Sequence, residues 1–245
     1  MKKPLKITLI SLCALLIGGA VYWFQFNHQG YRMSIPLRSD YDDKSERIYI
    51  DKAFRPHLTD ALHMLEEARV RVETFWKEHG GGRLVSDPYI ILSADKGNLQ
   101  KLGGDHDTHY HWFPVHTSYI SISDEYLNVD ILAHELSHAE FQARMTFKEM
   151  KKLPTWFDEG LALQNDYREQ YSEEEWEKQT DHGKNAVKPE DMDTPEEFYA
   201  GEAADRRFQY LCAKHMVTQI LENLGKDNLA VLLENCNEIG ELPFV

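Results

Sequence analysis

Two histidines and a glutamate in one short segment constrain the fold of this chain more than any other feature. Residues 134–138 read His-Glu-Leu-Ser-His. An α-helix has about 3.6 residues per turn, so His134 and His138 lie about 40° apart and point from one face. Glu135 lies on the flank of that face. Two imidazoles so placed can bind one metal ion, and the pattern predicts a helix that carries a metal site.

The apolar residues around the motif agree with a helix. One set falls on the face opposite to His134 and is expected in the core: Leu132, Leu136, Ala139 and Ala143. A second set gathers on the side of His134: Ile131, His138 and Phe141. The predicted helix therefore has a core stripe and a separate site stripe.

A second segment supplies an acid. Residues 153–162 read Leu-Pro-Thr-Trp-Phe-Asp-Glu-Gly-Leu-Ala. Thr155 is the predicted N-cap of a helix, with Asp158 at the capping-box spacing. Glu159 is the expected third metal ligand. Asp158 is an alternative ligand, or a hydrogen-bond partner for a ligating imidazole.

These two segments resemble the gluzincins, zinc metallopeptidases whose third metal ligand is a Glu on a later helix, and among them the small bacterial peptidase-MA-like domains. The likeness extends from about residue 45 to about residue 234. It rests on His134, Glu135, His138, Trp156, Glu159, Gly160 and Ala162. A metzincin would need Gly at position 141 and His at position 144, where this chain has Phe and Arg.

The resemblance implies a Zn²⁺ ion as cofactor, held by His134, His138 and Glu159, with Glu135 as the general base. Gluzincins often place a Tyr or His from a later segment near the oxyanion that forms during hydrolysis. Tyr210 is the predicted catalytic residue for this role, with Tyr199 and His215 as alternatives. Tyr210 also lies on an apolar stripe and could equally be a core residue.

The N-terminus is a separate segment. Residues 1–6 are a basic stub, and residues 7–26 form an apolar run long enough to span a bilayer as a helix. The lysines before the run favour a cytoplasmic N-terminus, which would place the catalytic part outside the cytoplasm. A cleaved signal peptide followed by secretion is the alternative, because 18–20 offers small residues.

The rest of the chain divides by pattern. Residues 27–46 are polar and predicted to be a tether, and residues 47–245 form the zinc metallopeptidase-like domain. Strands are expected at 47–51, 89–92 and 117–123, and a helix at 53–79. By resemblance, 117–123 is the candidate edge strand that pairs with substrate backbone.

One histidine-rich segment lies just before that strand. Residues 103–116 contain four histidines: His106, His109, His111 and His116. The spacing fits no fixed metal-ligand pattern. A flexible loop over the cleft is predicted, with a second metal site as the alternative.

Charge and cysteine content narrow the possible partners. The chain has 41 acidic and 27 basic residues and a formal net charge of −14. It shows no basic patch, so nucleic acid is not an expected partner. Cys212 and Cys236 could form a disulfide or lie reduced in the core.

The combined prediction is an α+β protein with a zincin-like fold. It has a small N-terminal mixed sheet, an active-site helix and a helical C-terminal part, preceded by one transmembrane helix. The expected activity is that of a membrane-anchored zinc endopeptidase acting on peptide or protein substrates. The alternatives are a catalytically silent zinc-binding domain that recognises a peptide or partner, and a zinc hydrolase of non-peptide bonds. The sequence specifies neither the substrate nor the oligomeric state.

Overall fold

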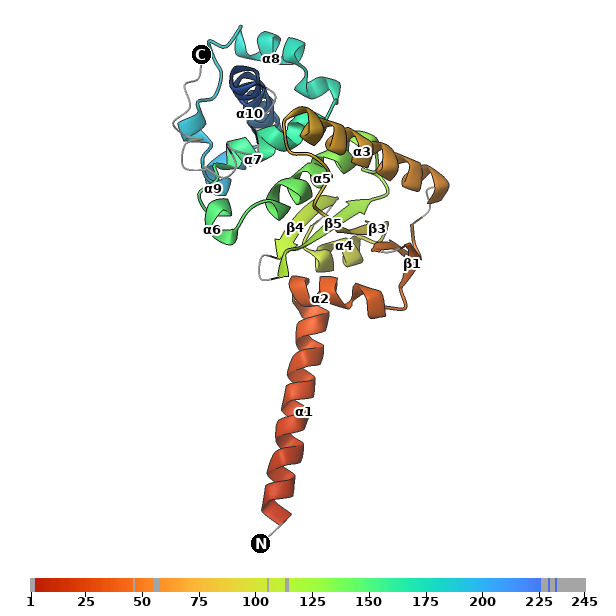
Figure 1. Ribbon diagram of the computed structural model, residues 1–245. Coiled ribbons are helices and arrows are strands. Elements are labelled where there is room, and N and C mark those ends of the chain that lie inside the picture. The colour runs from red at the N-terminus through yellow and green to blue at the C-terminus, as the bar shows by residue number, and fades with distance from the viewer. Residues whose placement is uncertain are drawn as a thin grey trace. The chain divides into compact units, whose positions relative to one another are not determined.

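The chain folds as a mixed α+β protein, which confirms the predicted class. The computed structural model describes residues 3–45, 47–54, 58–104, 106–112 and 115–225, together with Leu229 and Leu232. Its regular elements are helices and a five-stranded mixed sheet (Figure 1).

Two compact units make up the chain. The first, called the sheet unit, comprises Met1–Arg55, Tyr89–Thr108 and Ser121–Tyr126. The second, called the helical unit, comprises Pro56–Pro88, His109–Ile120 and Leu127–Val245.

The sheet has the strand order β1-β2-β3-β5-β4. Its strands are β1 (Tyr41–Ser45), β2 (Ile48–Asp51), β3 (Tyr89–Ser93), β4 (Asp107–Trp112) and β5 (Thr117–Ser123). β1 and β2 are antiparallel, whereas β2 and β3 are parallel with Ile48 opposite Ile90. β2 and β3 are mostly buried apolar runs, as expected of interior strands. The strands predicted at 47–51, 89–92 and 117–123 are confirmed.

The segment predicted to be a tether has regular structure instead. Within 27–46 lie α2 (His28–Ser34), the 3-10 turn η1 (Ile35–Leu37) and β1. Tyr31 and Ile35 are four residues apart and fully buried. The Tyr31 hydroxyl donates to Asn98 Oδ1 at 2.9 Å, in α4 (Lys96–Leu102). Two buried side chains one turn apart outweigh the polar composition from which a tether was inferred.

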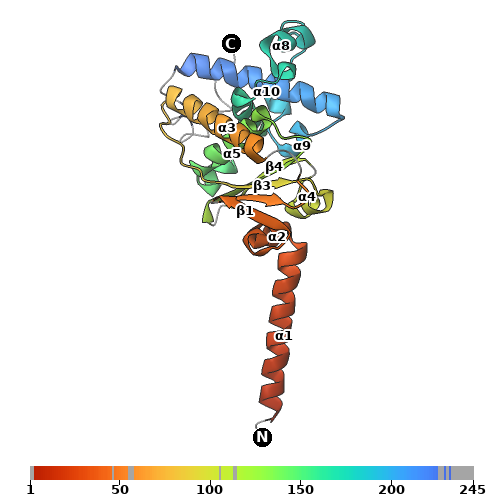
Figure 2. The same cartoon turned by 90° about the vertical axis from the view of Figure 1, so that its right-hand side faces the viewer.

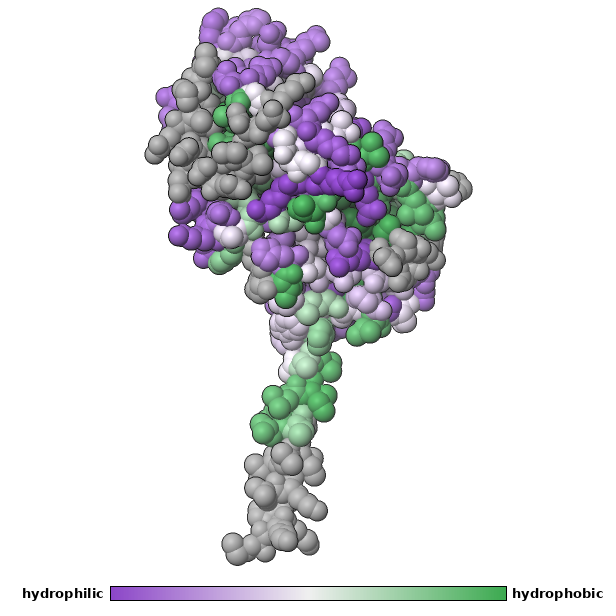
Figure 3. Space-filling model, in the orientation of Figure 1, coloured by the Kyte–Doolittle hydropathy of each residue, from purple (hydrophilic) through white to green (hydrophobic). Residues whose placement is uncertain are grey.

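The N-terminal helix α1 runs over Lys3–Phe26 and leads into α2 (Figure 2). Its described apolar side chains, among them Leu15, Leu16 and Val21, are exposed and form the green surface of that helix in Figure 3. Within the described part of the chain, no helix has both the length and the hydropathy of a membrane span. The transmembrane role predicted for residues 7–26 stays a prediction.

Strand β4 corrects two predictions. The histidine-rich segment predicted as a flexible loop forms this strand over Asp107–Trp112. β4 also lies at the edge of the sheet, whereas β5 lies between β3 and β4. The predicted edge strand at 117–123 is thus an interior strand, and β4 takes the edge position.

Among the described residues, the helical unit has five helices of eight residues or more. They are α3 (Leu58–Glu78), α5 (Val129–Ala143), α7 (Thr155–Ala162), α8 (Glu173–Thr180) and α10 (Ala203–Leu224). Shorter elements are α6 (Phe147–Met150), η3 (Leu163–Asn165), η4 (Glu169–Tyr171), η5 (Pro189–Asp191) and α9 (Pro195–Phe198). The helix predicted at 53–79 is α3.

Three helix pairs build the core of this unit. α3 packs along α5 through one buried stripe: Ala61, Leu65, Ala68, Val72 and Trp76 (Figure 1 and Figure 2). α5 packs against α7, and α7 against α10. The last contact is close because Gly160 has no side chain between its backbone and the carbonyl oxygen of Ala213. These contacts hold α5 and α7, the two helices that carry the site, in one packed group.

Candidate metal centre

Helix α5 carries the two histidines. The helix begins at Val129, after the Asn128 side chain, which accepts a hydrogen bond from the Ile131 amide at 2.9 Å. The predicted core residues Leu132, Leu136 and Ala139 are buried. The side of the helix that carries the motif is buried as well, since every residue from Ile131 to Phe141 is buried. The predicted core stripe and the predicted site stripe of α5 are therefore both buried.

Helix α7 carries the glutamate. Pro154 occupies the N-cap position and no side chain caps this end, so the predicted Thr155 N-cap is wrong. The amide of Thr155 donates instead to the Asp193 carbonyl at 2.8 Å, which satisfies one of the free amides of the first turn. Because Asp158 is not needed for a capping box, its carboxylate is available to the site.

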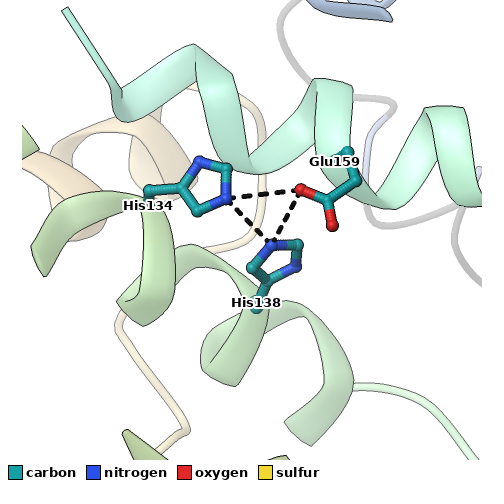
Figure 4. Close-up of side chains that lie close together, drawn as sticks. All are labelled: His134, His138 and Glu159. Atoms are coloured by element: carbon teal, nitrogen blue, oxygen red, sulfur yellow. Dashed lines mark hydrogen bonds and ion pairs between the residues drawn. The ribbon is translucent and has the colours of Figure 1, made fainter. Parts of the chain in front are cut away.

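Three buried ligand atoms converge between α5 and α7. His134 Nε2 and His138 Nε2 are 3.2 Å apart, and Glu159 Oε2 lies 3.3 Å from the first and 3.4 Å from the second (Figure 4). All three residues are buried. Tetrahedral zinc with bonds of about 2.0–2.1 Å keeps its ligand atoms about 3.3–3.4 Å apart. The three atoms thus occupy one face of a tetrahedron of that size, and the group could hold a metal ion.

The polar atoms at the centre of this triangle also fit a cation. Glu159 Oε2 is buried, and its nearest polar neighbours are the two histidine Nε2 atoms. A buried carboxylate oxygen is costly unless a positive charge compensates it. A metal ion bound between the two imidazole nitrogens and Glu159 Oε2 would supply this positive charge.

Asp158 orients His138. His138 Nδ1 donates to Asp158 Oδ1 at 2.9 Å, so a neutral His138 directs the lone pair of Nε2 into the triangle. Burial disfavours the charged imidazole, but the carboxylates of Asp158 and Glu159 outweigh this effect and raise the pKa of His138 well above 6.5. Burial likewise opposes ionisation of Glu159, but the two histidines outweigh it and lower the pKa of the Glu159 carboxyl. Asp158 therefore supports a ligand rather than binding in place of Glu159.

Asp166 lies behind His134. Its Oδ2 is 3.9 Å from His134 Nδ1, which is too long for a hydrogen bond. The Asp166 carboxylate is fully buried and bound by Arg168, whose Nε donates to both carboxylate oxygens at 2.9 Å. Burial opposes ionisation of Asp166, but the Arg168 contact outweighs it and lowers the pKa of Asp166. A carboxylate thus lies beside the Nδ1 atom of each ligating histidine, at 2.9 Å for Asp158 and 3.9 Å for Asp166.

The other predicted site residues have different positions. Glu135 follows His134 in α5 and is buried. The Tyr210 ring, in α10, lies edge-on to the His134 ring with centroids 6.4 Å apart. The Tyr199 hydroxyl donates to Glu159 Oε1. Tyr199 and Tyr210 therefore contact residues of the metal-binding group, and Glu135 follows one of those residues in α5.

His215 is directed to another part of the helical unit. Its ring stacks on Trp176 with centroids 3.4 Å apart, and its Nδ1 lies 2.9 Å from Glu173 Oε2. These contacts occupy the imidazole beside α8. His215 is not one of the side chains that the fold brings to the triangle.

The sequence did not single out His109 as a site residue. In β4, its ring stacks nearly parallel to the ring of His138, with centroids 5.9 Å apart and an interplanar angle of 12°. His111, two residues on, binds Ser118 Oγ through Nδ1 at 2.8 Å. Alternation along the strand places His109 and His111 on one face, which a strand assignment for 107–112 would have indicated.

The disulfide considered between Cys212 and Cys236 involves a residue that the structure does not describe. Cys212 is buried and free, and Cys236 lies outside the described residues. Burial raises the pKa of the Cys212 thiol.

No protein-family model, curated protein or solved structure matches this chain. The likeness to gluzincins therefore rests on the motif residues alone and stays a prediction.

Proposed function

We propose that this chain is a zinc-dependent peptidase of the gluzincin type. The observation that carries the proposal is the buried triangle of His134, His138 and Glu159, with atom separations of 3.2–3.4 Å and with Glu135 on the same helix as the two histidines. Two imidazoles and one carboxylate are a donor set of catalytic zinc sites, which keep a fourth position open. A purely structural zinc site has four protein ligands, and only three converge here within the described residues.

When bound, zinc would supply the Lewis acidity that lowers the pKa of water and polarises a substrate carbonyl. Side chains of the protein would perform the remaining steps. Glu135 accepts a proton from the attacking water and delivers it to the leaving nitrogen. Asp158 keeps the Nδ1 hydrogen of His138 in place, so Nε2 stays free for the metal. Tyr210, beside His134, is the candidate that stabilises the oxyanion.

Peptides and proteins are the proposed substrates. The proposed mode is endopeptidase cleavage, at internal bonds of the substrate. Among the described residues, no group that would hold a substrate terminus is identified. Strand β4 is at the sheet edge and could pair with an extended peptide. Attachment to the membrane and an extracytoplasmic location stay predictions from the sequence.

Digestion of an unbiased peptide library tests the proposal. Wild type and Glu135→Gln are compared with zinc bound to both. Cleavage by the wild type, lost in a variant that still binds zinc, supports the assigned roles. Equal cleavage by both would refute the role of Glu135. Zinc binding without cleavage by either would favour a silent zinc-binding domain or a hydrolase of non-peptide bonds, and the latter is checked with ester substrates.

A further inference from the structure

The two carboxylate oxygens of Glu159 have different neighbours. Oε2 faces the Nε2 atoms of both histidines at 3.3 and 3.4 Å. Oε1 faces away from them and accepts a hydrogen bond from the Tyr199 hydroxyl. One oxygen thus belongs to the triangle, and the other is held by a residue 40 positions further along the chain.

The segment that carries Tyr199 is fastened to the start of α7, the helix of Glu159. The amides of Thr155 and Trp156 donate to the carbonyls of Asp193 and Met192 at 2.8 and 3.2 Å. Trp156 Nε1 also donates to Asp193 Oδ1 at 3.1 Å. These bonds fix the segment and the third-ligand helix to each other before Tyr199 is reached.

Two further features hold Tyr199 in place. A capping box at Thr194 begins α9, which ends at Phe198, and the Phe198 side chain is fully buried. Tyr199 follows at once as the C-cap residue of α9. The buried ring and the capped turn hold the backbone that leads to Tyr199, which is itself 42% exposed.

The phenol acts as the donor of this bond. A phenol has a usual pKa of about 10, so the Tyr199 hydroxyl carries its hydrogen near neutral pH. A phenol has one hydrogen to donate, and here it is used on Glu159 Oε1. In this arrangement Tyr199 cannot also donate to an oxyanion, the role considered for it from the sequence.

We propose that Tyr199 is a positioning residue that makes Glu159 a ligand through Oε2 alone. This inference rests on the proposed zinc site. By holding Oε1, the hydroxyl prevents the carboxylate from binding a metal ion with both oxygens. The fourth position of a tetrahedral ion is then left for water or substrate. Tyr199 acts through Glu159 and not on the substrate.

Tyr199→Phe tests this role, because it removes the hydroxyl and keeps the ring. Tyr167→Phe is the matched control, since the Tyr167 side chain is 63% exposed and its ring contacts Arg71. Zinc affinity is measured on the full chain by competition with a chelator, and circular dichroism checks that each variant is folded. We expect Tyr199→Phe to bind zinc about 10- to 100-fold more weakly, as for other residues that orient metal ligands. Tyr167→Phe should bind like the wild type.

The visible absorption of the cobalt(II)-loaded proteins gives a second readout that does not depend on activity. Four-coordinate cobalt absorbs more strongly than five-coordinate cobalt. If Glu159 gains a second metal bond in Tyr199→Phe, the absorption falls relative to wild type and Tyr167→Phe. Unchanged zinc affinity together with an unchanged spectrum would overturn the positioning role. Failure of the wild type itself to bind either metal would overturn the proposed function, and the inference with it.

Discussion

The contact between α7 and α10 offers a quantitative test, because it depends on the absence of one side chain. In Gly160→Ala, the new Cβ would lie 2.4 Å from the Ala213 carbonyl oxygen and 2.6 Å from Val217 Cγ2. The first neighbour is backbone, so no rotamer change relieves the clash and the helices must separate. Overpacking of this kind costs roughly 1–3 kcal/mol, and a backbone clash places it at the upper end. The higher helix propensity of Ala offsets about 1 kcal/mol. We expect a net loss of about 2 kcal/mol.

The same change should weaken the metal site, because Glu159 precedes Gly160 and moves with α7. Urea unfolding of the metal-free protein, followed by tryptophan fluorescence, measures the stability, and chelator competition measures the zinc affinity. Gly19→Ala is the control, since a Cβ at Gly19 meets no atom within 4 Å. We expect a lower urea midpoint and weaker zinc binding for Gly160→Ala alone. A variant as stable as the wild type, or more stable, would refute the close-packing argument.

Three other polar groups, at Asp158, His111 and Glu140, give further predictions. Asp158→Asn should weaken zinc binding about 10- to 100-fold in a competition assay, because the carboxylate orients His138. Burial and then the charge of a neighbouring histidine lower the pKa of His111 to about 4, so the unfolded chain binds more protons between pH 6.5 and 4. The free energy of unfolding should therefore fall by at most about 1.4 kcal/mol per pH unit as pH drops through that window, and His111→Asn should flatten this part of a urea-midpoint profile. Glu140→Ala should cost about 3–5 kcal/mol in urea unfolding, because Glu140 is fully buried and Arg144 Nε donates to it at 2.8 Å; a loss below about 1 kcal/mol would contradict this assignment.

Local patterns were enough to predict the parts of the site that lie close together in the sequence. The spacing of His134 and His138 requires only helix geometry, and α5 has it. The apolar periodicity of α3 and the short apolar run of β3 are likewise local, and both elements form as predicted. The convergence of Glu159 on the two histidines was expected from the family resemblance, and the structure brings the three together.

Features that depend on long-range contacts were not predicted. Strand β4 was predicted as a loop because its segment is polar and contains several histidines. Its pairing with β5 decides its structure and its edge position, and this pairing is not visible in the local sequence. The α2 segment depends on burial of Tyr31, and its polar neighbours gave the opposite indication. The contact from Tyr199 to Glu159 spans 40 residues, and no spacing rule relates the two. Asp166 lies near His134 Nδ1 because η3 turns the chain just after α7.

His134, His138 and Glu159 are proposed to bind one zinc ion as a set. The most direct measurement is the zinc content of the full chain after loading and dialysis, with wild type and His138→Ala treated side by side. We predict one zinc per chain for the wild type and loss of that zinc in the variant. A wild type that retains no zinc, or a variant that retains as much as the wild type, would contradict the account.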